Sequence, residues 1–268
     1  MDKKIAIISG SGKFPFLFAQ AAKEKGFHVV SIAIKNNTSL WLRSYVDEVH
    51  WFKVSELQRM IDFLKNKEIT HVVMAGQIQP RTLFKKDIMQ DPEIKKLMLD
   101  LKDRRADSVF GAIADKLVNS GLKLLDSTSF LEEYLPKKSV LTKGQIDQNL
   151  WEDINFGFKL AKEIARLDIG QTVVVKKKAV VAVESIEGTD ATIKRAGYIA
   201  KDGCVMVKVS KPHQDMRFDI PVVGLRTVKN LIKIKAKCLA IEADKTLIID
   251  IEKCIKLANR HNLIIAAI

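Results

Sequence analysis

The chain has 268 residues, 47% of them hydrophobic, and a formal net charge of +13 at pH 7. This length suits two domains with sizeable cores, and the absence of any apolar run of about 18 residues argues against a membrane-spanning helix. The positive charge favours anionic partners, such as nucleic acid, an anionic membrane surface or phosphorylated small molecules.

The start of the chain and its cysteines indicate a reducing compartment. Met1 to Lys4 leads directly into a short apolar segment that lacks the length and the cleavage site of a secretory signal. We therefore expect a cytoplasmic protein. Cys204, Cys238 and Cys254 lie far apart in the sequence, which favours buried free thiols over disulfides or a structural zinc site.

The first half of the sequence alternates short apolar runs with helical patterns. Strands are expected at residues 4–8, 27–34, 48–52, 71–75 and 121–125. Helices are expected from Pro15 onward, at residues 55–66, and in pieces between 80 and 119. This alternation predicts a parallel sheet with right-handed crossovers, and hence an N-terminal Rossmann-like domain of the α/β class.

Two glycine-bearing turns follow expected strands of this domain. Because ligands bind at the carboxyl ends of parallel strands, we predict phosphate or nucleotide contacts there, from Gly10, Gly12, Lys13, Gly76 and Gln77. The first turn lacks the third glycine of the dinucleotide fingerprint and the Gly-Lys-Ser/Thr of a P-loop. A purely structural turn between strand and helix is therefore the alternative.

A change of periodicity marks the boundary between two domains. Asp107 stands near the start of the last helix of the first half, where an acidic residue is favourable even without a function. Residues 133–150 lose periodicity and carry proline, glycine and several lysines, which is typical of a linker. We expect domains at residues 1–132 and 151–268.

The second half again mixes helices and strands. The expected helices are residues 151–166, 228–235 and 252–262, and the expected strands are residues 172–175, 179–183, 238–241, 246–249 and 263–268. The first two of these strands flank a short lysine turn and should form a hairpin. These patterns predict an α/β domain with mixed strand pairing.

Polar side chains gather between Glu184 and Thr227, in a mixture that suits a phosphate and a divalent cation. The run Glu187-Gly-Thr-Asp190 is equally explained by a turn followed by a helix cap. Asp219 lies in a short apolar segment, where burying an unpaired carboxylate would be costly. It requires a partner, and a cation or Arg217 would serve.

Several ordered motifs carry a resemblance to a known family. They are Gly10-Ser-Gly-Lys-Phe-Pro15, Ala75-Gly-Gln77, Leu167-Asp-Ile-Gly-Gln171, Val183-Glu-x-x-Glu-Gly-Thr-Asp190, Lys211-Pro-x-Gln214, Arg217-Phe-Asp-Ile-Pro221 and Gly224 to Thr227. In these motifs the chain resembles the UDP-2,3-diacylglucosamine pyrophosphatases of the LpxI family. Two positions depart from the family: Arg105-Ala-Asp107 replaces Gly-Asp-Asp, and Ser11 stands where glycine is commoner.

The resemblance implies a magnesium-dependent hydrolase of lipid A biosynthesis. Such an enzyme splits UDP-2,3-diacylglucosamine into UMP and 2,3-diacylglucosamine 1-phosphate, called lipid X. It also implies a Rossmann-like N-terminal domain and a distinct C-terminal domain, with a ligand chamber between them. The essential aspartate of the family corresponds to Asp219.

The expected roles follow from the chemistry of phosphoanhydride hydrolysis, which needs charge neutralisation and an oriented water. We expect Asp219 to be catalytic, and Asp219, Asp190 and Glu187 to bind Mg²⁺. Besides the glycine turns, the expected substrate-binding residues are Asp107, Gln171, Gly188, Thr189, Arg195, Lys211 and Gln214.

Two other functions stay open at this point. A non-catalytic nucleotide-sugar or lipid-binding protein would keep the glycine turns without needing Asp219. A nucleic-acid-binding protein would explain the charge, but an aromatic fraction of 7% argues against it, so we expect no nucleic-acid partner. A lipid substrate predicts peripheral contact with the inner face of the inner membrane. The sequence leaves a homodimer open.

Overall fold

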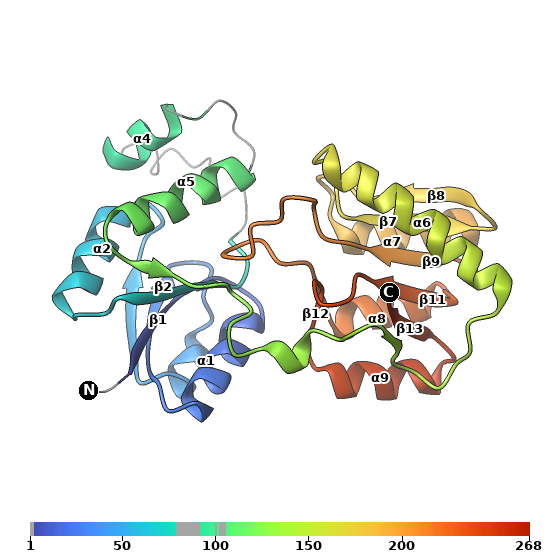
Figure 1. The fold of residues 1–268 in the computed structure, drawn as a ribbon, viewed down its shortest axis with the longest axis horizontal. Helices are drawn as coiled ribbons and strands as arrows, with labels where there is room; N and C mark the ends of the chain where they lie inside the picture. Colours follow the sequence, from blue (N-terminus) through green and yellow to red (C-terminus); the bar gives the residue numbers. More distant parts are fainter. Residues whose placement is uncertain (1–2, 79–91, 100, 102–105) are drawn as a thin grey trace. The chain divides into compact units, whose positions relative to one another are not determined.

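The computed structural model describes residues 3–78, 92–99, 101 and 106–268. Contacts divide the chain into two compact units (Figure 1). Unit 1 comprises Met1–Leu131 together with Asp215–Asp219, and unit 2 comprises Glu132–Gln214 and Ile220–Ile268.

Unit 1 is built on a five-stranded sheet in which every pairing is parallel. Its strands are β1 (Lys4–Ser9), β2 (His28–Ile34), β3 (Glu48–Phe52), β4 (His71–Ala75) and β5 (Lys123–Leu124), in the order β3-β2-β1-β4-β5. This confirms the Rossmann-like prediction. The chain moves outward from β1 to β3 and then returns to β4 on the other side of β1, so the topological switch point lies between β1 and β4.

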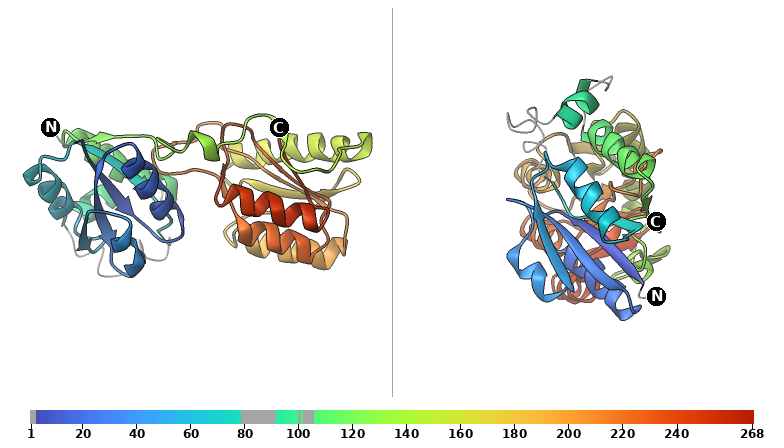
Figure 2. Two further views of the ribbon diagram at one scale, coloured as in Figure 1. Left: turned by 90° about the horizontal axis from the view of Figure 1, so that it is seen from below. Right: turned by 90° about the vertical axis from the view of Figure 1, so that its left-hand side faces the viewer.

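Helices cover both faces of this sheet, as Figures 1 and 2 show. They are α1 (Phe14–Glu24), α2 (Leu57–Asn66), α4 (Pro92–Leu99) and α5 (Ala106–Asn119), with a short 3₁₀ helix η1 (Leu40–Ser44) between β2 and β3. Alternate residues of each strand point to opposite faces. Ala6 and Ile8 accordingly join one core with α2 and α5, whereas Ile5 and Ile7 are fully buried on the other face.

Unit 2 contains a six-stranded mixed sheet in the order β6-β13-β11-β9-β7-β8. Its strands are β6 (Ser139–Val140), β7 (Thr172–Lys176), β8 (Ala179–Val183), β9 (Val205–Lys208), β11 (Cys238–Ile241) and β13 (Ile264–Ala267). Strands β9, β11 and β13 run parallel, and β7, β8 and β6 pair antiparallel with their neighbours. The expected mixed pairing is confirmed. Strands β10 (Val222–Val223) and β12 (Leu247–Ile248) form a separate parallel pair.

One long helix covers one face of the unit 2 sheet, and three shorter helices cover the other. The long helix is α6 (Gln148–Arg166), and the others are α7 (Thr189–Ala200), α8 (Leu225–Lys233) and α9 (Ile251–Arg260). Helix α6 buries Leu150, Ile154 and Ala161 against the sheet, and further apolar side chains of the helix are partly buried on the same core. Among the described residues, no helix is long and apolar enough to cross a membrane.

The expected hairpin is present and closes through two lysines. Lys177 and Lys178 have φ angles of 50° and 57°, as a two-residue turn between β7 and β8 requires. The carboxylate of Asp153 accepts hydrogen bonds from both backbone N–H groups, at 2.9 and 2.6 Å. This contact stabilises a turn that usually contains glycine or asparagine.

The segment expected to be a linker is part of unit 2. Strand β6 pairs with β13, and Asp147 caps α6 by accepting a hydrogen bond from the Leu150 N–H at 2.7 Å. A 3₁₀ turn, η3 (Glu132–Tyr134), precedes them. A two-residue strand is too short to show alternation, so β6 has no periodic signal in the sequence.

Candidate active-site residues

The two glycine turns lie against each other at the switch point of unit 1. Ser11 and Gln77 form an isolated antiparallel bridge, with N–H to carbonyl distances of 2.8 and 3.0 Å. A Cβ added to Gly10 would lie 2.7 Å from the Gly76 carbonyl carbon. Gly76 has a φ of +92°, and its added Cβ would lie 2.7 Å from the Ser11 oxygen. Glycine is therefore needed at both positions by the close approach of two backbones.

The first turn also begins helix α1. Lys13 is the N-cap residue, and no side chain there accepts a hydrogen bond from the first turn of the helix. Gly12 has a φ of +90°, with no atom within 4 Å of its added Cβ. A helix N-terminus without a side-chain cap suits an anionic ligand. The structure thus brings together all five residues expected in this region, and their role in binding stays a prediction.

Asp219 belongs to a segment, residues 215–219, that packs on unit 1 and that we call the strap. The expected C-terminal domain included this aspartate, but its contacts group it with the N-terminal sheet. Ser127, which follows β5, donates its N–H to the Met216 carbonyl at 2.9 Å, and its Oγ lies 2.6 Å from the carbonyls of Met74 and Arg217. Phe218 packs against the core of unit 1. The strap therefore brings the half-buried Asp219 to the carboxyl ends of β4 and β5.

An arginine fixes the shape of the strap. Arg217 donates from Nε and Nη2 to the two carboxylate oxygens of Asp215, at 2.9 and 2.6 Å, and from Nη2 to Asp115 of α5 at 3.2 Å. The guanidinium of Arg217 holds the pKa of Asp215 below its usual range, against the opposing effect of burial. Asp219 closes the turn with its N–H on the Asp215 carbonyl at 2.9 Å. The sequence reasoning offered Arg217 as a partner for Asp219, and the structure pairs it with Asp215 and Asp115.

A second polar group lies at one edge of the unit 2 sheet. We call it the Lys208 cluster: Lys208 at the end of β9, Thr189 at the start of α7 and Glu184 just after β8. Lys208 Nζ donates to Thr189 Oγ1 at 2.8 Å, and Thr189 Oγ1 donates to Glu184 Oε1 at 2.6 Å. Lys208 is 8% exposed and Glu184 is 9% exposed. Charged groups are thus buried at the carboxyl end of a parallel strand.

Two buried oxygens at this cluster, Glu184 Oε2 and Thr172 Oγ1, have no hydrogen-bond partner within the described parts of the chain. Thr172 lies directly opposite Lys208 in the β7–β9 pairing, so the two side chains share one face of the sheet. Buried polar atoms are nearly always hydrogen-bonded in native proteins. These oxygens can therefore accept hydrogen bonds from a ligand or a buried water.

Lys211 and Gln214 form a turn close to this edge. The Lys211 N–H donates to Gln214 Oε1 at 2.6 Å, and Lys211 Nζ pairs with Asp168 at 2.8 Å. Nearby, Glu242 accepts hydrogen bonds from Lys162 Nζ at 2.9 Å and from the Ser210 N–H at 2.7 Å. These contacts fix the chain between β9 and the strap.

Three of the expected ligands have structural contacts. Arg195 donates to the Val183 carbonyl and to Glu187, both at 2.7 Å. Glu187 accepts further hydrogen bonds from the Ser185 N–H and Thr192. Asp190 accepts from Asn230 at 2.7 Å and pairs with Arg226 at 2.7 Å, which connects α7 to α8.

These contacts bear on the metal prediction. Among the described residues, no group of three or more His, Cys, Asp or Glu side chains could hold a metal ion. The carboxylates of Glu187 and Asp190 are already neutralised by arginines. As arranged here they do not fit a ready Mg²⁺ site. Asp219 is half-buried, and a carboxylate is a hard oxygen ligand of the kind that Mg²⁺ prefers.

The remaining expected residues have simple positions. Gly188 is the N-cap of α7 with a φ of 80°, and Gln171 precedes β7, where its carbonyl accepts the Val209 N–H at 3.0 Å. The backbone of Asp107 lies in α5, and its side chain lies outside the described residues.

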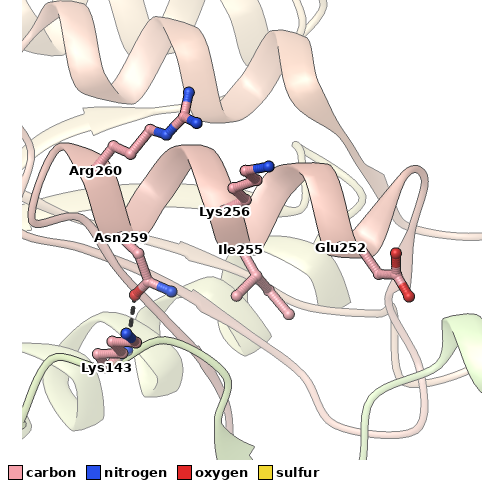
Figure 3. Close-up of a pocket in the computed structure, with 6 residues that line it drawn as sticks. All are labelled: Lys143, Glu252, Ile255, Lys256, Asn259 and Arg260. Atoms are coloured by element: carbon pink, nitrogen blue, oxygen red, sulfur yellow. Dashed lines mark hydrogen bonds between the residues drawn. The ribbon is translucent and has the colours of Figure 1, made fainter.

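One open pocket, of about 610 Å³, lies elsewhere in unit 2. It is lined by Lys143, Glu252, Ile255, Lys256, Asn259 and Arg260, along α9 (Figure 3). The Lys143 N–H donates to the Asn259 side chain at 2.8 Å. None of the expected site residues lines this pocket.

Sequence reasoning named Glu184 only as part of a polar stretch and did not name Lys208 as a site residue. One signal was present: Lys208 interrupts the apolar run from Cys204 to Val209. A lysine within a buried strand requires a partner. Its partner, Thr189, is 19 residues away in the sequence, so the pair could not be assigned without the fold.

Comparisons with known proteins cover almost the whole chain. Residues 4–134 match the model of the LpxI N-terminal domain, and residues 137–266 match the model of the LpxI C-terminal domain. A protein of Caulobacter vibrioides named UDP-2,3-diacylglucosamine pyrophosphatase LpxI is 24% identical over an alignment of 277 positions, which covers 99% of this chain and 98% of that protein.

Solved structures show only weak likeness. The biotin carboxylase domain of Hydrogenobacter thermophilus 2-oxoglutarate carboxylase is 13% identical, with a TM-score of 0.29 over 75% of this chain and 41% of that one. Phosphoribosylglycinamide synthetase from Anaerococcus prevotii is 14% identical, with a TM-score of 0.26 over 70% and 40%. The chain spans about two fifths of these proteins, and so weak a likeness carries no functional argument.

Proposed function

Since the chain belongs to the LpxI family, we propose that it hydrolyses the pyrophosphate bond of UDP-2,3-diacylglucosamine in lipid A biosynthesis. The reaction consumes one water, whose oxygen bonds to a phosphorus while the bridging P–O bond breaks. The products are UMP and 2,3-diacylglucosamine 1-phosphate. The name of the Caulobacter relative supports this substrate.

The observation that carries the proposal is the position of Asp219. This half-buried carboxylate lies at the carboxyl ends of β4 and β5, on a strap held by Ser127 and Arg217. It lies on the same edge of the sheet as the glycine turns, where ligands of such sheets bind. A carboxylate there can orient the attacking water and accept its proton.

Mg²⁺ is the cofactor of this proposal. It supplies neutralisation of the diphosphate charge and usually binds through one or two carboxylates plus substrate phosphate oxygens. Asp219 would be its protein ligand. The arginine contacts of Glu187 and Asp190 make these two residues poorer candidates, and we propose that the substrate phosphates supply most of the remaining ligands.

Each unit, taken by itself, offers groups that suit part of a nucleotide-sugar. The N-terminus of α1, which follows the first glycine turn and has no side-chain cap, suits phosphate oxygens. The Lys208 cluster offers a cation together with unsatisfied oxygens that can accept hydrogen bonds from sugar hydroxyls. Ile186, which lies between Glu184 and Thr189 in the sequence, is 103% exposed, and Leu167 and Ile169, just before the close approach of Gly170 to Glu184, are 57% and 46% exposed. Exposed apolar side chains in these segments suit a lipid-linked sugar.

Peripheral contact with the inner face of the inner membrane is part of the proposal. The substrate carries two acyl chains, and the protein is strongly basic. A homodimer stays a prediction that sedimentation can test. The expectation of no nucleic-acid partner likewise stays a prediction.

UMP release from detergent-dispersed UDP-2,3-diacylglucosamine tests the function, with Mg²⁺ present or chelated. The wild type should release UMP only with Mg²⁺, and Asp219→Ala should lower the rate by about a thousandfold, as removal of a transition-state contact does. Substrate binding by Asp219→Ala, measured by calorimetry, should persist. Asp202→Ala, in an exposed carboxylate of unit 2, is the matched control and should keep full activity.

The two remaining interpretations predict different results. A nucleotide-sugar or lipid-binding protein would bind the substrate without releasing UMP under either condition. If Asp219→Ala releases UMP as fast as the wild type, the role of Asp219 is wrong even if the function is right.

A further inference from the structure

The 3₁₀ helix η1 exposes two large apolar side chains in a row. Leu40 is 71% exposed and Trp41 is 77% exposed, whereas Leu42 is 1% exposed and anchors the helix. Tyr45, which follows η1, is 42% exposed. We call Lys35, Leu40, Trp41, Arg43 and Tyr45 the Trp41 patch. Isolated exposed apolar residues are ordinary, but a cluster containing tryptophan indicates a contact surface.

Hydrogen bonds hold this patch in a defined shape. Ser39 caps η1 by accepting the Trp41 N–H on its Oγ at 3.3 Å and the Leu42 N–H on its carbonyl at 3.1 Å. Thr38 accepts the Ile34 N–H at 2.9 Å and donates its hydroxyl to the Ser9 carbonyl. Leu40 and Trp41 are thus presented by a fixed loop.

These contacts also locate the patch beside the candidate binding edge. Ser9, which accepts from Thr38, is the residue before Gly10 in the first glycine turn. Tyr45 meets Phe16 of the first turn of α1 edge-on, with ring centroids 5.1 Å apart. The Trp41 patch therefore adjoins the same helix N-terminus that we assign to phosphate.

The patch itself carries positive charge and no acid. Glu56, which lies outside the patch, accepts from the Lys53 N–H and from Arg59, and these two contacts together with the charge of Lys35 lower its pKa. Lys35 and Arg43 are exposed, and residues 35–46 contain no acidic side chain. The next acid, Asp47, pairs with Lys23 at 2.8 Å. Exposed apolar side chains next to cations match the surface of a bilayer that contains anionic lipids.

We propose that the Trp41 patch is the surface through which unit 1 contacts an anionic lipid bilayer. This inference rests on the proposed function, since a lipid-linked substrate has to be taken from a membrane. Tryptophan and tyrosine favour the interfacial region of bilayers, and nearby lysine and arginine are attracted to anionic headgroups. A second protein copy is a poorer occupant, because a stable interface buries about 800 Å² per partner and few large side chains are offered here.

Co-sedimentation with vesicles tests the inference directly. The wild type should bind phosphatidylcholine vesicles that contain phosphatidylglycerol more tightly than pure phosphatidylcholine vesicles. The double variant Leu40→Ser/Trp41→Ser should bind the anionic vesicles about tenfold more weakly, which corresponds to about 1.4 kcal/mol. The matched control is Tyr198→Ser/Ile199→Ser, which removes two apolar side chains of unit 2 that are 88% and 56% exposed, and it should bind like the wild type.

Activity separates this inference from the proposed function. The Leu40→Ser/Trp41→Ser variant should hydrolyse detergent-dispersed substrate at the wild-type rate and vesicle-embedded substrate about tenfold more slowly. Failure of the wild type to release UMP from detergent-dispersed substrate would reject the function but not the vesicle binding.

Three results would overturn the inference. The first is that the wild type does not bind vesicles. The second is that the Leu40→Ser/Trp41→Ser variant binds vesicles as tightly as the wild type. The third is that the Tyr198→Ser/Ile199→Ser control loses as much vesicle binding as the Leu40→Ser/Trp41→Ser variant. If sedimentation equilibrium shows that the Leu40→Ser/Trp41→Ser variant loses a self-association that the wild type has, the patch is a contact between copies and the membrane assignment is wrong.

Discussion

The two units build their candidate binding edges in different ways. In unit 1 the edge is formed mainly by backbone, because Gly10 and Gly76 allow two turns to approach within hydrogen-bond distance at Ser11 and Gln77. In unit 2 the edge is formed by side chains, with Lys208, Thr189 and Glu184 buried in a hydrogen-bonded chain. Backbone N–H groups can bind phosphate oxygens whichever side chains the residues carry. A buried lysine and carboxylate instead select ligands by charge and geometry.

This difference teaches which mutations should affect the fold and which should affect the ligand. At the unit 1 edge an added methyl group meets the backbone, so a substitution should lower the free energy of unfolding. At the unit 2 edge we expect the sheet and helices to stay folded when one side chain is removed, so a substitution should weaken ligand binding instead. The strap is the exception in unit 1, since Arg217 shapes it through side-chain contacts.

Gly76→Ala should have the largest effect on stability. Its Cβ would meet the Ser11 oxygen at 2.7 Å and Pro15 Cγ at 2.8 Å, at a φ of +92°. We expect a loss of about 3 kcal/mol in the free energy of unfolding, from backbone strain and overpacking together. Urea unfolding, followed through Trp41 and Trp51 in a Trp151→Phe background, reports on unit 1.

Gly12→Ala is the control for this measurement. Its φ of +90° is equally unfavourable, but nothing lies within 4 Å of the added Cβ, so we expect a loss of about 1 kcal/mol. Equal losses for the two variants would show that close backbone approach does not determine this edge.

Lys208→Met should weaken the interaction with the substrate. The substitution removes the donor to Thr189, and we expect kcat/KM to fall about thirtyfold, the effect of losing about 2 kcal/mol from a charged hydrogen bond. Lys176→Met makes the same change on β7 of the same sheet, where the amine contacts Ala200 and Asp202. It should keep kcat/KM within about twofold. A fall caused by unfolding would appear in circular dichroism and would argue for a structural lysine.

Arg217→Gln should loosen the strap that positions Asp219. We expect kcat to fall about tenfold with KM nearly unchanged, because a misplaced Asp219 carboxylate slows the chemical step. Arg217→Lys keeps the charge but cannot make two parallel hydrogen bonds to Asp215, so it should restore activity only in part. Unchanged kcat in both variants would show that the strap does not depend on this arginine.

Glu48→Gln should produce the smallest effect, away from both edges. Hydrogen bonds from His50 and Lys67 lower the pKa of Glu48 to about 2, against an ordinary value of 4.5. A carboxylate whose pKa is lowered by folding stabilises the protein at pH values above its unfolded-state pKa. This stabilisation is lost as the pH falls through its folded-state pKa. The side chain is 32% exposed, so we expect a difference of about 1 kcal/mol or less at pH 6.

The pH dependence provides the check on Glu48. The difference in unfolding free energy between wild type and Glu48→Gln should shrink as pH falls from about 4.5 toward about 2. A difference that stays constant over this range would contradict the assigned cause. Activity at neutral pH should be the same in both proteins, since Glu48 lies at the start of β3, away from the glycine turns.

The sequence by itself determined the elements and the motifs. Short apolar runs and helical periodicity are local properties, and they were enough to predict the parallel sheet, the glycine turns after β1 and β4, and the β7–β8 hairpin. The same local reading identified the motif around Asp219. It missed β6, because a two-residue strand has no period to detect.

Only the tertiary structure decided which charges meet. Lys208 reaches Thr189 across 19 residues, and Arg217 reaches Asp115 across 102. It also decided that Glu187 and Asp190 pair with arginines, and that the strap leaves the second half of the chain to join unit 1. Such pairings depend on strand order and helix packing, which bring distant residues together and which no local pattern records.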